Sequence, residues 1–345
     1  MSNQPPIEVP QGAIRLNTET QRLEFFAQDR WYVMATDVPT LHDASNSDKL
    51  GGARGFFMGG GEPAETDRIE FVTIPTQGNA KDFGDLTKAR MEAAALSNAT
   101  RALAAGDSVP GSNDTIDVFI MSSTGDAVDF GNLLSSTNNM QGNGALANAT
   151  RGIFGGGYQA GSGQVNILQF VTINSNGNAE DFGDLDGSNY SGVVGGSSPT
   201  RGLWFGGGPS GGVNTIQFVT IASTGNTSDF GDKTDADSHG TTASNSVRIL
   251  YFTGQSLTNL IEYVTTATSG NAIDFGDMTI TTRYSATAGS SPTRGVVGGG
   301  GYPNRTNVID YNQIMTQGNS VDFGDLVTER FLCVKGCVST GHGGL

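Results

Sequence analysis

The residues with the clearest capacity for chemistry are the aspartates of a repeated Asp-Phe-Gly-Asp motif, first met at residues 82–85. Paired carboxylates beside a glycine could hold Mg²⁺ or Ca²⁺. The Asp-Phe-Gly motif that holds magnesium in protein kinases works with a Gly-rich loop, a strand lysine and a His-Arg-Asp loop, which this sequence lacks. The motif also lacks the alternating oxygen ligands of a calcium loop. We therefore predict no metal site and no cofactor.

Other catalytic groups are equally sparse. The histidines are His42, His239 and His342, and no two of them have the spacing of metal ligands. The glycine runs are not followed by Gly-Lys-Ser/Thr, so they do not predict a phosphate-binding loop. We expect no catalytic residues and no enzymatic activity.

Charge and cysteine content narrow the possible partners and compartments. The formal net charge of −15 argues against nucleic acid as a partner. Cys333 and Cys337 stand four apart in a predicted strand, roughly 13 Å from each other, which is too far for a disulfide. The first twelve residues show no charged-then-apolar leader, and no apolar run is long enough to span a membrane. We expect folding in a reducing cytosol and no membrane insertion.

The Asp-Phe-Gly motif is one part of a long repeat. Its phenylalanines lie 47, 52, 48, 45 and 48 residues apart, and a period in this range is typical of repeat architectures. The six positions are Phe83, Phe130, Phe182, Phe230, Phe275 and Phe323. We predict a structural role for them, with each Phe packed between repeats and each following Gly allowing a bulge or a close backbone approach.

Each repeat contains the pattern of four short strands. The first is rich in small residues, the second begins at an Arg and ends in glycines, the third alternates as in Ile69 and Phe71, and the fourth carries Asp-Phe-Gly-Asp. Four antiparallel strands per repeat predict a propeller blade, so the fold is predicted to be all-β with six blades. The first repeat has no first strand before Arg54. We predict that residues 331–338 supply it by pairing beside residues 54–59, so that the C-terminal strand closes the ring.

The order of these features resembles the kelch family of propeller repeats. Residues 259–263, Asn-Leu-Ile-Glu-Tyr, match its motif best, and residues 307–311 match it nearly as well. A kelch repeat normally has Trp where these repeats have the Phe of Asp-Phe-Gly. The resemblance implies a kelch-like propeller over residues 53–345, but it implies no single function, because propellers serve many.

A small module precedes the propeller. From Gly12 the sequence alternates, turns, alternates again and reaches a third strand at Trp31, which predicts a three-stranded hairpin module in residues 1–36, followed by a linker in residues 37–52. The module resembles the hairpin near the start of many bacteriophage fibre and virion proteins. Its predicted attachment residues are Ile14, Leu16, Leu23, Phe25 and Trp31. Three short strands bury too little surface to be stable alone, so we expect them to rest on a partner.

Loop lengths point to one face of the propeller as the binding face. The turn between the third and fourth strands is constant, whereas the Arg-to-Ile interval runs 15, 15, 17, 15, 13, 15 and the Phe-to-Arg interval runs 18, 21, 19, 18, 19. In an antiparallel blade the two variable connections emerge on the same face, and binding usually uses variable loops. The candidate binding residues on this face are Tyr158, Gln159, Tyr302, Arg305, Asn138, Asn139 and Gln141.

The opposite face is predicted to carry a ring of ion pairs between two repeated sets. The arginines that open the second strands are Arg54, Arg101, Arg151, Arg201, Arg248 and Arg294. The aspartates that precede the motif phenylalanines are Asp82, Asp129, Asp181, Asp229, Asp274 and Asp322.

Together the two resemblances imply a non-enzymatic bacteriophage virion structural protein, a tail fibre or tip component assembled in the host cytoplasm. The N-terminal module would bind other virion proteins, and the propeller would bind a host-surface glycan or a neighbouring virion protein. We expect a homo-oligomer, with a trimer favoured. Two alternatives stay open: a passive decoration of the capsid or tail, and an intracellular kelch-type scaffold for protein–protein interaction.

Overall fold

A computed structural model describes residues 10, 13–17, 22–27, 30–33, 53–61, 64–108, 114–134, 140–159, 163–187, 190–208, 212–256, 258–281, 283–301 and 304–345. The chain divides into two compact units, Met1–Asn46 and Ser47–Leu345. The described residues form strands and turns, and none of them lies in a helix long and apolar enough to cross a membrane.

The smaller unit contains a three-stranded antiparallel sheet of β1 (Ile14–Asn17), β2 (Arg22–Ala27) and β3 (Arg30–Val33), with β2 in the centre. Its register pairs Ile14 with Phe25 and Leu16 with Leu23. The Trp31 ring meets the Phe26 ring edge-on and carries the Arg15 guanidinium 4.1 Å from its centroid. The predicted linker lies outside the described residues.

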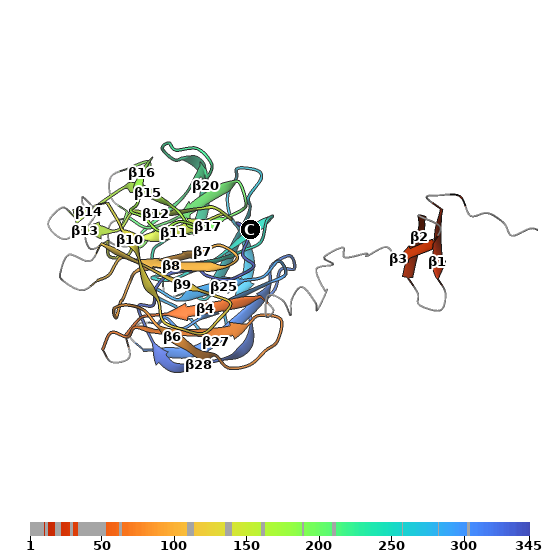
Figure 1. Cartoon of the computed structure of the whole chain (residues 1–345). Coiled ribbons are helices and arrows are strands. Elements are labelled where there is room, and N and C mark those ends of the chain that lie inside the picture. Colours follow the sequence, from red (N-terminus) through yellow and green to blue (C-terminus); the bar gives the residue numbers. More distant parts are fainter. Residues whose placement is uncertain are drawn as a thin grey trace, which may run out of the picture. The chain divides into compact units, whose positions relative to one another are not determined.

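The larger unit is a six-bladed β-propeller, as predicted (Figure 1). Blade 1 contains β4 (Arg54–Met58), β5 (Arg68–Thr73) and β6 (Lys81–Asp85), and blade 2 contains β7 (Ala94–Ser97), β8 (Arg101–Ala105), β9 (Thr115–Ile120) and β10 (Val128–Asn132). Blade 3 contains β11 (Gly144–Ala147), β12 (Arg151–Gly155), β15 (Ile167–Thr172) and β16 (Glu180–Asp184), with an inserted hairpin of β13 (Tyr158–Gln159) and β14 (Gly163–Gln164). Blade 4 contains β17 (Val194–Ser197), β18 (Arg201–Phe205), β19 (Val213–Thr220) and β20 (Ser228–Asp237). Blade 5 contains β21 (Thr241–Ser244), β22 (Arg248–Phe252), β23 (Leu260–Thr265) and β24 (Ile273–Asp277), and blade 6 contains β25 (Thr287–Ser290), β26 (Arg294–Gly298), β27 (Thr306–Gln313) and β28 (Val321–Arg330).

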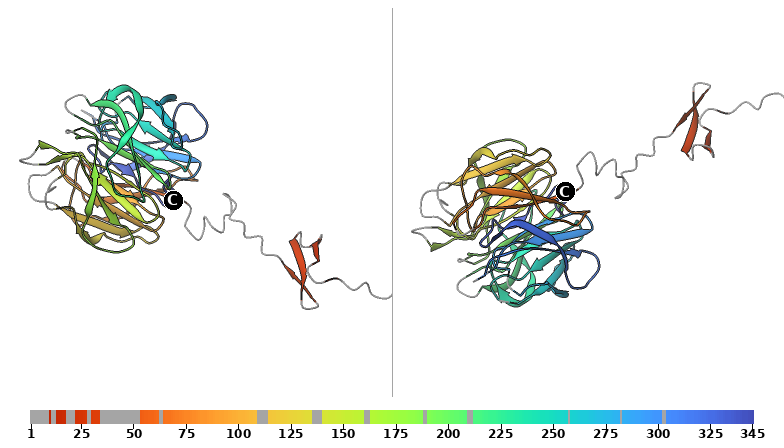
Figure 2. Two further views of the ribbon diagram at one scale, coloured as in Figure 1. Left: turned by 90° about the horizontal axis from the view of Figure 1, so that it is seen from above. Right: turned by 90° about the horizontal axis from the view of Figure 1, so that it is seen from below.

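The C-terminal segment closes the ring, as predicted, but not as a regular strand. At its two ends it forms antiparallel bridges with blade 1, where Ser339 pairs with Gly55 of β4 and Phe331 pairs with Gly61 just after β4. Between these bridges β29 (Gly336–Cys337) pairs in parallel with β25 of blade 6, and Lys335 bridges to Ala94 of blade 2. The segment therefore joins three blades. Figures 1 and 2 show the result as orange strands of blade 1 beside blue strands of blade 6.

The last residues of the chain lie between the inner strands, the first strands of the blades. His342 Nε2 lies 2.6 Å from the Ser97 carbonyl oxygen at the end of β7, and Gly343 donates its N–H to Ser244 Oγ at the end of β21. His342 is buried, and burial lowers the pKa of its imidazole to about 4. The neutral ring thus packs at the axis without a buried charge.

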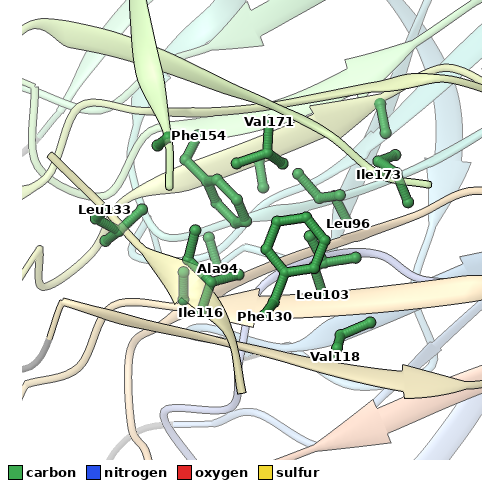
Figure 3. Packing of buried hydrophobic residues seen from close by; sticks show 14 of the residues in the cluster. Ala94, Leu96, Leu103, Ile116, Val118, Phe130, Leu133, Phe154, Val171 and Ile173 are labelled. Atoms are coloured by element: carbon green, nitrogen blue, oxygen red, sulfur yellow. The ribbon is translucent and has the colours of Figure 1, made fainter. Parts of the chain in front are cut away.

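The hydrophobic core consists of layers between neighbouring blades. Figure 3 shows one of them, in which Phe130 and Leu103 of blade 2 meet Phe154 and Val171 of blade 3. The motif phenylalanines are all buried, with 2–3% of their surface exposed. In five repeats the motif ring lies 5.8–6.1 Å from the aromatic ring of the adjacent third strand, as Phe182 does from Phe170.

The glycine of each Asp-Phe-Gly lies against the next blade. A Cβ on Gly231 would approach the Gly270 carbonyl oxygen to 2.4 Å, and the other five motif glycines meet the corresponding carbonyl at 2.3–2.6 Å. The turn glycine also donates its N–H to the carbonyl oxygen of the motif phenylalanine, as Gly270 does to Phe230 at 2.7 Å. The motif is thus a contact between blades, and its glycine also sits at the register shift between strands three and four.

A second repeated contact uses the polar residue that follows the third-strand Ile or Leu. Its side chain accepts a hydrogen bond from a backbone N–H four residues after the preceding motif phenylalanine, as Asp117 does from Thr87 at 3.0 Å. The six acceptors are Glu70, Asp117, Gln169, Gln217, Glu262 and Asp310. In three blades a fully buried arginine pairs with the carboxylate, as in Arg283–Asp310 at 2.9 Å.

The predicted ring of Arg–Asp ion pairs is wrong. Each second-strand arginine instead donates to a backbone carbonyl at the third-strand end of the next blade, as Arg151 does to Ile221 at 2.9 Å. Each guanidinium also lies 4.3–5.4 Å from an aromatic ring of its own blade, as Arg151 does from Phe170. Carbonyl oxygens at the end of a strand have no hydrogen-bond partner within the sheet, so they accept from the arginine. An ion pair between the arginine and an exposed aspartate would add little stability.

Candidate functional site

The connections of the propeller separate into two faces. On the first, Gln141 in the connection between blades 2 and 3 bridges to Tyr158, which follows the second strand of blade 3. We call this side, with its blade-to-blade and second-to-third connections, the variable face. On the second, Asn98 in a first-to-second turn donates to the Ala149 carbonyl, and Arg101 donates to the Ile173 carbonyl. We call this side the constant face.

The structure brings three of the predicted binding residues together. Tyr158 and Gln159 form β13, and Tyr158 exchanges two backbone hydrogen bonds with Gln141, at 2.7 and 3.0 Å. The Tyr158 residue is 43% exposed. The β13–β14 hairpin lies at the periphery of the propeller (Figure 1). Gln164 in this hairpin donates a hydrogen bond from its side chain to the Gly208 carbonyl of blade 4.

The other predicted residues do not join this group in the described structure. Arg305 is exposed in blade 6 and lies 5.3 Å from the Phe331 ring. Tyr302, Asn138 and Asn139 lie outside the described residues. In the N-terminal unit Ile14 is 63% exposed and Trp31 is partly buried, whereas the side chains of Leu16, Leu23 and Phe25 lie outside the description.

A closed ring of backbone hydrogen bonds surrounds the propeller axis on the variable face. One residue from each blade adopts positive φ just before the inner strand, and each blade donates an N–H to the carbonyl of the blade before it, at 2.7–2.9 Å. The six residues of this axial ring are Glu92, Gly142, Gly192, His239, Ser285 and Leu332. At the closure the donor is Cys333, next to Leu332.

Three polar side chains of the axial ring form the centre of the candidate site. Glu92 accepts a hydrogen bond from Gln141 Nε2, and its other carboxylate oxygen lies 4.0 Å from His239 Nε2. The His239 ring stacks on Tyr284 at 4.5 Å between centroids. Ser285 is fully buried and its Oγ has no hydrogen-bond partner within the described part of the chain.

Lys335 lies next to the axial ring, in the interior of the propeller. The inner strands are otherwise built from small residues, such as Ala-Ala-Leu-Ser in β7 and Thr-Ala-Gly-Ser in β25. The lysine is fully buried and donates from Nζ to the carbonyl oxygens of Gly142 at 3.1 Å and Val193 at 3.4 Å. Burial lowers its pKa to about 8, although Glu92 opposes that shift. Burial and the charge of Lys335 together hold the pKa of His239 well below its usual value.

We call Glu92, Gln141, His239, Ser285 and Lys335 the axial centre. It combines a carboxylate, a neutral imidazole, a hydroxyl and an ammonium group at the end of the propeller axis. The described residues contain no group of three or more His, Cys, Asp or Glu side chains placed to hold a metal ion. The carboxylate, imidazole, hydroxyl and ammonium groups of the axial centre are all able to form hydrogen bonds with a ligand.

Apart from Gln141, sequence reasoning missed the axial centre, although a signal was present. Glu92, Gly142, Gly192, His239 and Ser285 all stand two residues before an inner strand. Glycine at two of these aligned positions indicates a backbone with positive φ. The same alignment would have shown that the other three positions carry polar side chains in an unfavourable backbone conformation.

Replacing Lys335 by Met should stabilise the propeller at pH 7, because burial disfavours the charged form of the Lys335 ammonium group in the folded state. Lys335 loses its proton near pH 8 when folded and near 10.5 when unfolded, so the unfolded wild-type chain binds more protons between these values. Wild-type stability should therefore rise across this window, and the advantage of Lys335→Met should disappear by its upper end.

The measurement is denaturant unfolding of both proteins at pH 7 and pH 10.5. Lys88→Met provides the matched control, because Lys88 is exposed and its replacement changes the net charge equally. A difference between Lys335→Met and wild type that does not change with pH would contradict the assignment of a buried, charged lysine.

No protein-family model and no curated protein matches the chain.

Proposed function

We propose that this chain is a non-enzymatic virion structural protein of a bacteriophage, a tail fibre or tip component with a kelch-like propeller. The N-terminal module attaches it to other virion proteins. The variable face of the propeller binds a host-surface glycan or a neighbouring virion protein. The protein assembles in the host cytoplasm as a homo-oligomer.

The observation that carries the binding role is the different use of the two faces. On the constant face, the repeated arginines and turn glycines are occupied by contacts between blades. On the variable face, blade 3 inserts the β13–β14 hairpin with the exposed Tyr158, and the axial ring carries polar side chains. Exposed aromatic residues on variable loops are typical anchors of binding sites.

The attachment role is supported by the N-terminal unit. Its three strands form one sheet within a compact unit, Met1–Asn46. A sheet of three short strands needs a partner surface for stability. Its sequence resembles the hairpin modules of phage fibre proteins, which is the basis for proposing a virion as that partner.

The location is tested by electron microscopy of phage particles labelled with an antibody against the propeller. We expect the label at the tail end or on fibres. Label over the capsid would favour a passive decoration instead. Antigen that is absent from purified particles and confined to infected cells would overturn the proposal in favour of an intracellular scaffold.

Attachment should depend on the aromatic residues of the variable face. The double change Tyr158→Ala and Tyr302→Ala is expected to lower binding of the purified chain to bacterial cells about tenfold or more, as for truncation of an aromatic anchor. The melting temperature should change little, because Tyr158 is 43% exposed and lies in an inserted hairpin, not in the core between blades. Met315→Ala is the control, since Met315 is 50% exposed on the constant face. Equal cell binding by both variants would move the binding site away from the variable face.

A further inference from the structure

The axial ring holds four side chains where glycine would fit better. Glu92, His239, Ser285 and Leu332 have φ values of 50–59°, and they are all the non-glycine residues with positive φ in the described structure. Such conformations are costly for residues other than glycine and collect at functional sites. Gly142 and Gly192 occupy the same ring, so the ring itself needs no side chain. The three polar side chains therefore need a reason beyond closing the propeller.

Two hydrogen-bond acceptors face each other in the axial centre. The Ser238 hydroxyl donates to Gln255 Oε1, so its oxygen accepts the proton that His239 carries on Nδ1, 3.0 Å away. His239 Nε2 therefore presents a lone pair toward the Glu92 carboxylate oxygen at 4.0 Å. This distance is too long for a hydrogen bond between them. Within the described part of the chain neither Glu92 Oε1 nor His239 Nε2 accepts a hydrogen bond, and the two side chains are 6% and 13% exposed.

The charges of the centre favour a neutral ligand. Glu92 and Lys335 are the carboxylate and ammonium groups of the centre and interact with each other. An added cation would meet Lys335, and an added anion would meet Glu92, each at a low-dielectric site where an uncompensated charge is costly. The buried Ser285 Oγ, which has no partner within the described residues, adds a group that can donate or accept.

We propose that the axial centre binds adjacent hydroxyl groups of a neutral saccharide, with Glu92 and His239 as the acceptors. The proposal rests on the proposed glycan-binding function and adds the chemical class of the ligand and the residues that recognise it. Adjacent hydroxyls of a sugar ring are two donors held side by side, as the two acceptors require. Gln141 links the centre to the rim, because its side chain donates to Glu92 and its backbone pairs with Tyr158. The exposed Tyr158 ring is placed to contact the outer part of an oligosaccharide.

The experiment compares the full chain with Glu92→Gly and Leu332→Gly on an array of neutral, sialylated and amino-sugar oligosaccharides. Both variants place glycine at a ring position with positive φ, which relieves backbone strain, and the melting temperature of each is measured to confirm that it is folded before binding is compared. Only Glu92→Gly removes an acceptor. Its affinity for the neutral glycans that wild type binds should fall about ten- to a hundredfold, the loss expected for a hydrogen bond to a charged group. Leu332→Gly should bind like wild type.

Two results would overturn the proposal: equal binding by both variants, or wild-type binding only to charged glycans or to none. If the chain is found on phage tails but binds no neutral glycan, the proposed virion role stands and this inference is wrong. If the chain binds neutral glycans through Glu92 but is absent from phage particles, this inference stands and the proposed virion role is wrong.

Discussion

A chain that ends at Arg330 is expected to lose cooperative unfolding altogether. The removed segment donates and accepts the hydrogen bonds that close blade 1: Phe56 N–H to the Val338 carbonyl, Val334 N–H to the Met58 carbonyl, and Gly61 N–H to the Phe331 carbonyl. Without it, β4 has a free edge at the centre of the propeller. An open ring exposes backbone groups that the closed ring satisfies.

The lost burial is a large fraction of the total stability of a domain. Val334 and Val338 are fully buried in the core between blades 1 and 2, and full burial of one such side chain contributes about 1.5–3 kcal/mol. Cys333 and the fully buried Lys335 go with them. Whole domains are stable by only about 5–15 kcal/mol, so losing the two valines, about 3–6 kcal/mol together, removes a large part of that stability before the opened edge of blade 1 is counted.

The measurement is thermal unfolding followed by near-ultraviolet circular dichroism and calorimetry. The control is a chain that begins at Ser47, which lacks about three times as many residues but keeps the whole propeller unit, Ser47–Leu345. That chain should keep the propeller transition. A chain ending at Arg330 that melts cooperatively near the wild-type temperature would show that closure is not needed for folding.

The repeat pattern predicted the fold well because each strand carries its own local signal. The alternation around Ile69 and Phe71, the glycines after the second strand and the invariant third-to-fourth turn all act within a few residues. The missing first strand before Arg54 located the closure, because only the C-terminal segment remained to supply it. Its pairing with β25 and β7 could not be read from the sequence, because it depends on how three blades meet at the axis.

Side-chain partners were harder to predict because many of them are backbone atoms. The second-strand arginines were expected to pair with aspartates, yet Arg201 donates to the carbonyls of Thr266 and Ala267 in the next blade. Because every residue has a backbone carbonyl, the sequence gives no sign of which carbonyl accepts the hydrogen bond from the arginine. The axial centre was missed for a related reason: Glu92, His239 and Lys335 are far apart in the sequence and meet only once six blades form a ring.

The glycine of Asp-Phe-Gly should contribute to stability mainly because it has no side chain, and less because of its backbone conformation. Two glycines of blade 4 allow the two contributions to be measured separately. Gly231 has φ +149° and a Cβ there would lie 2.4 Å from the Gly270 carbonyl oxygen, whereas Gly225 has φ +153° and open space around its Cβ position. Gly225→Ala should cost about 1–2 kcal/mol through backbone strain alone. Gly231→Ala should cost the same plus about 1–3 kcal/mol for the steric overlap.

The free energies of unfolding of the two variants, measured in urea, decide between these effects. The Gly270 carbonyl cannot move away cheaply, because Gly270 donates to the Phe230 carbonyl at 2.7 Å and Ala272 donates to the Asp232 carbonyl at 2.8 Å. Any shift that relieves an added methyl group must therefore stretch the contact between blades 4 and 5. Equal costs for Gly231→Ala and Gly225→Ala would mean that this contact yields freely, and that the motif glycine serves only the bulge. A larger cost for Gly231→Ala would identify the motif as the element that sets the distance between neighbouring blades.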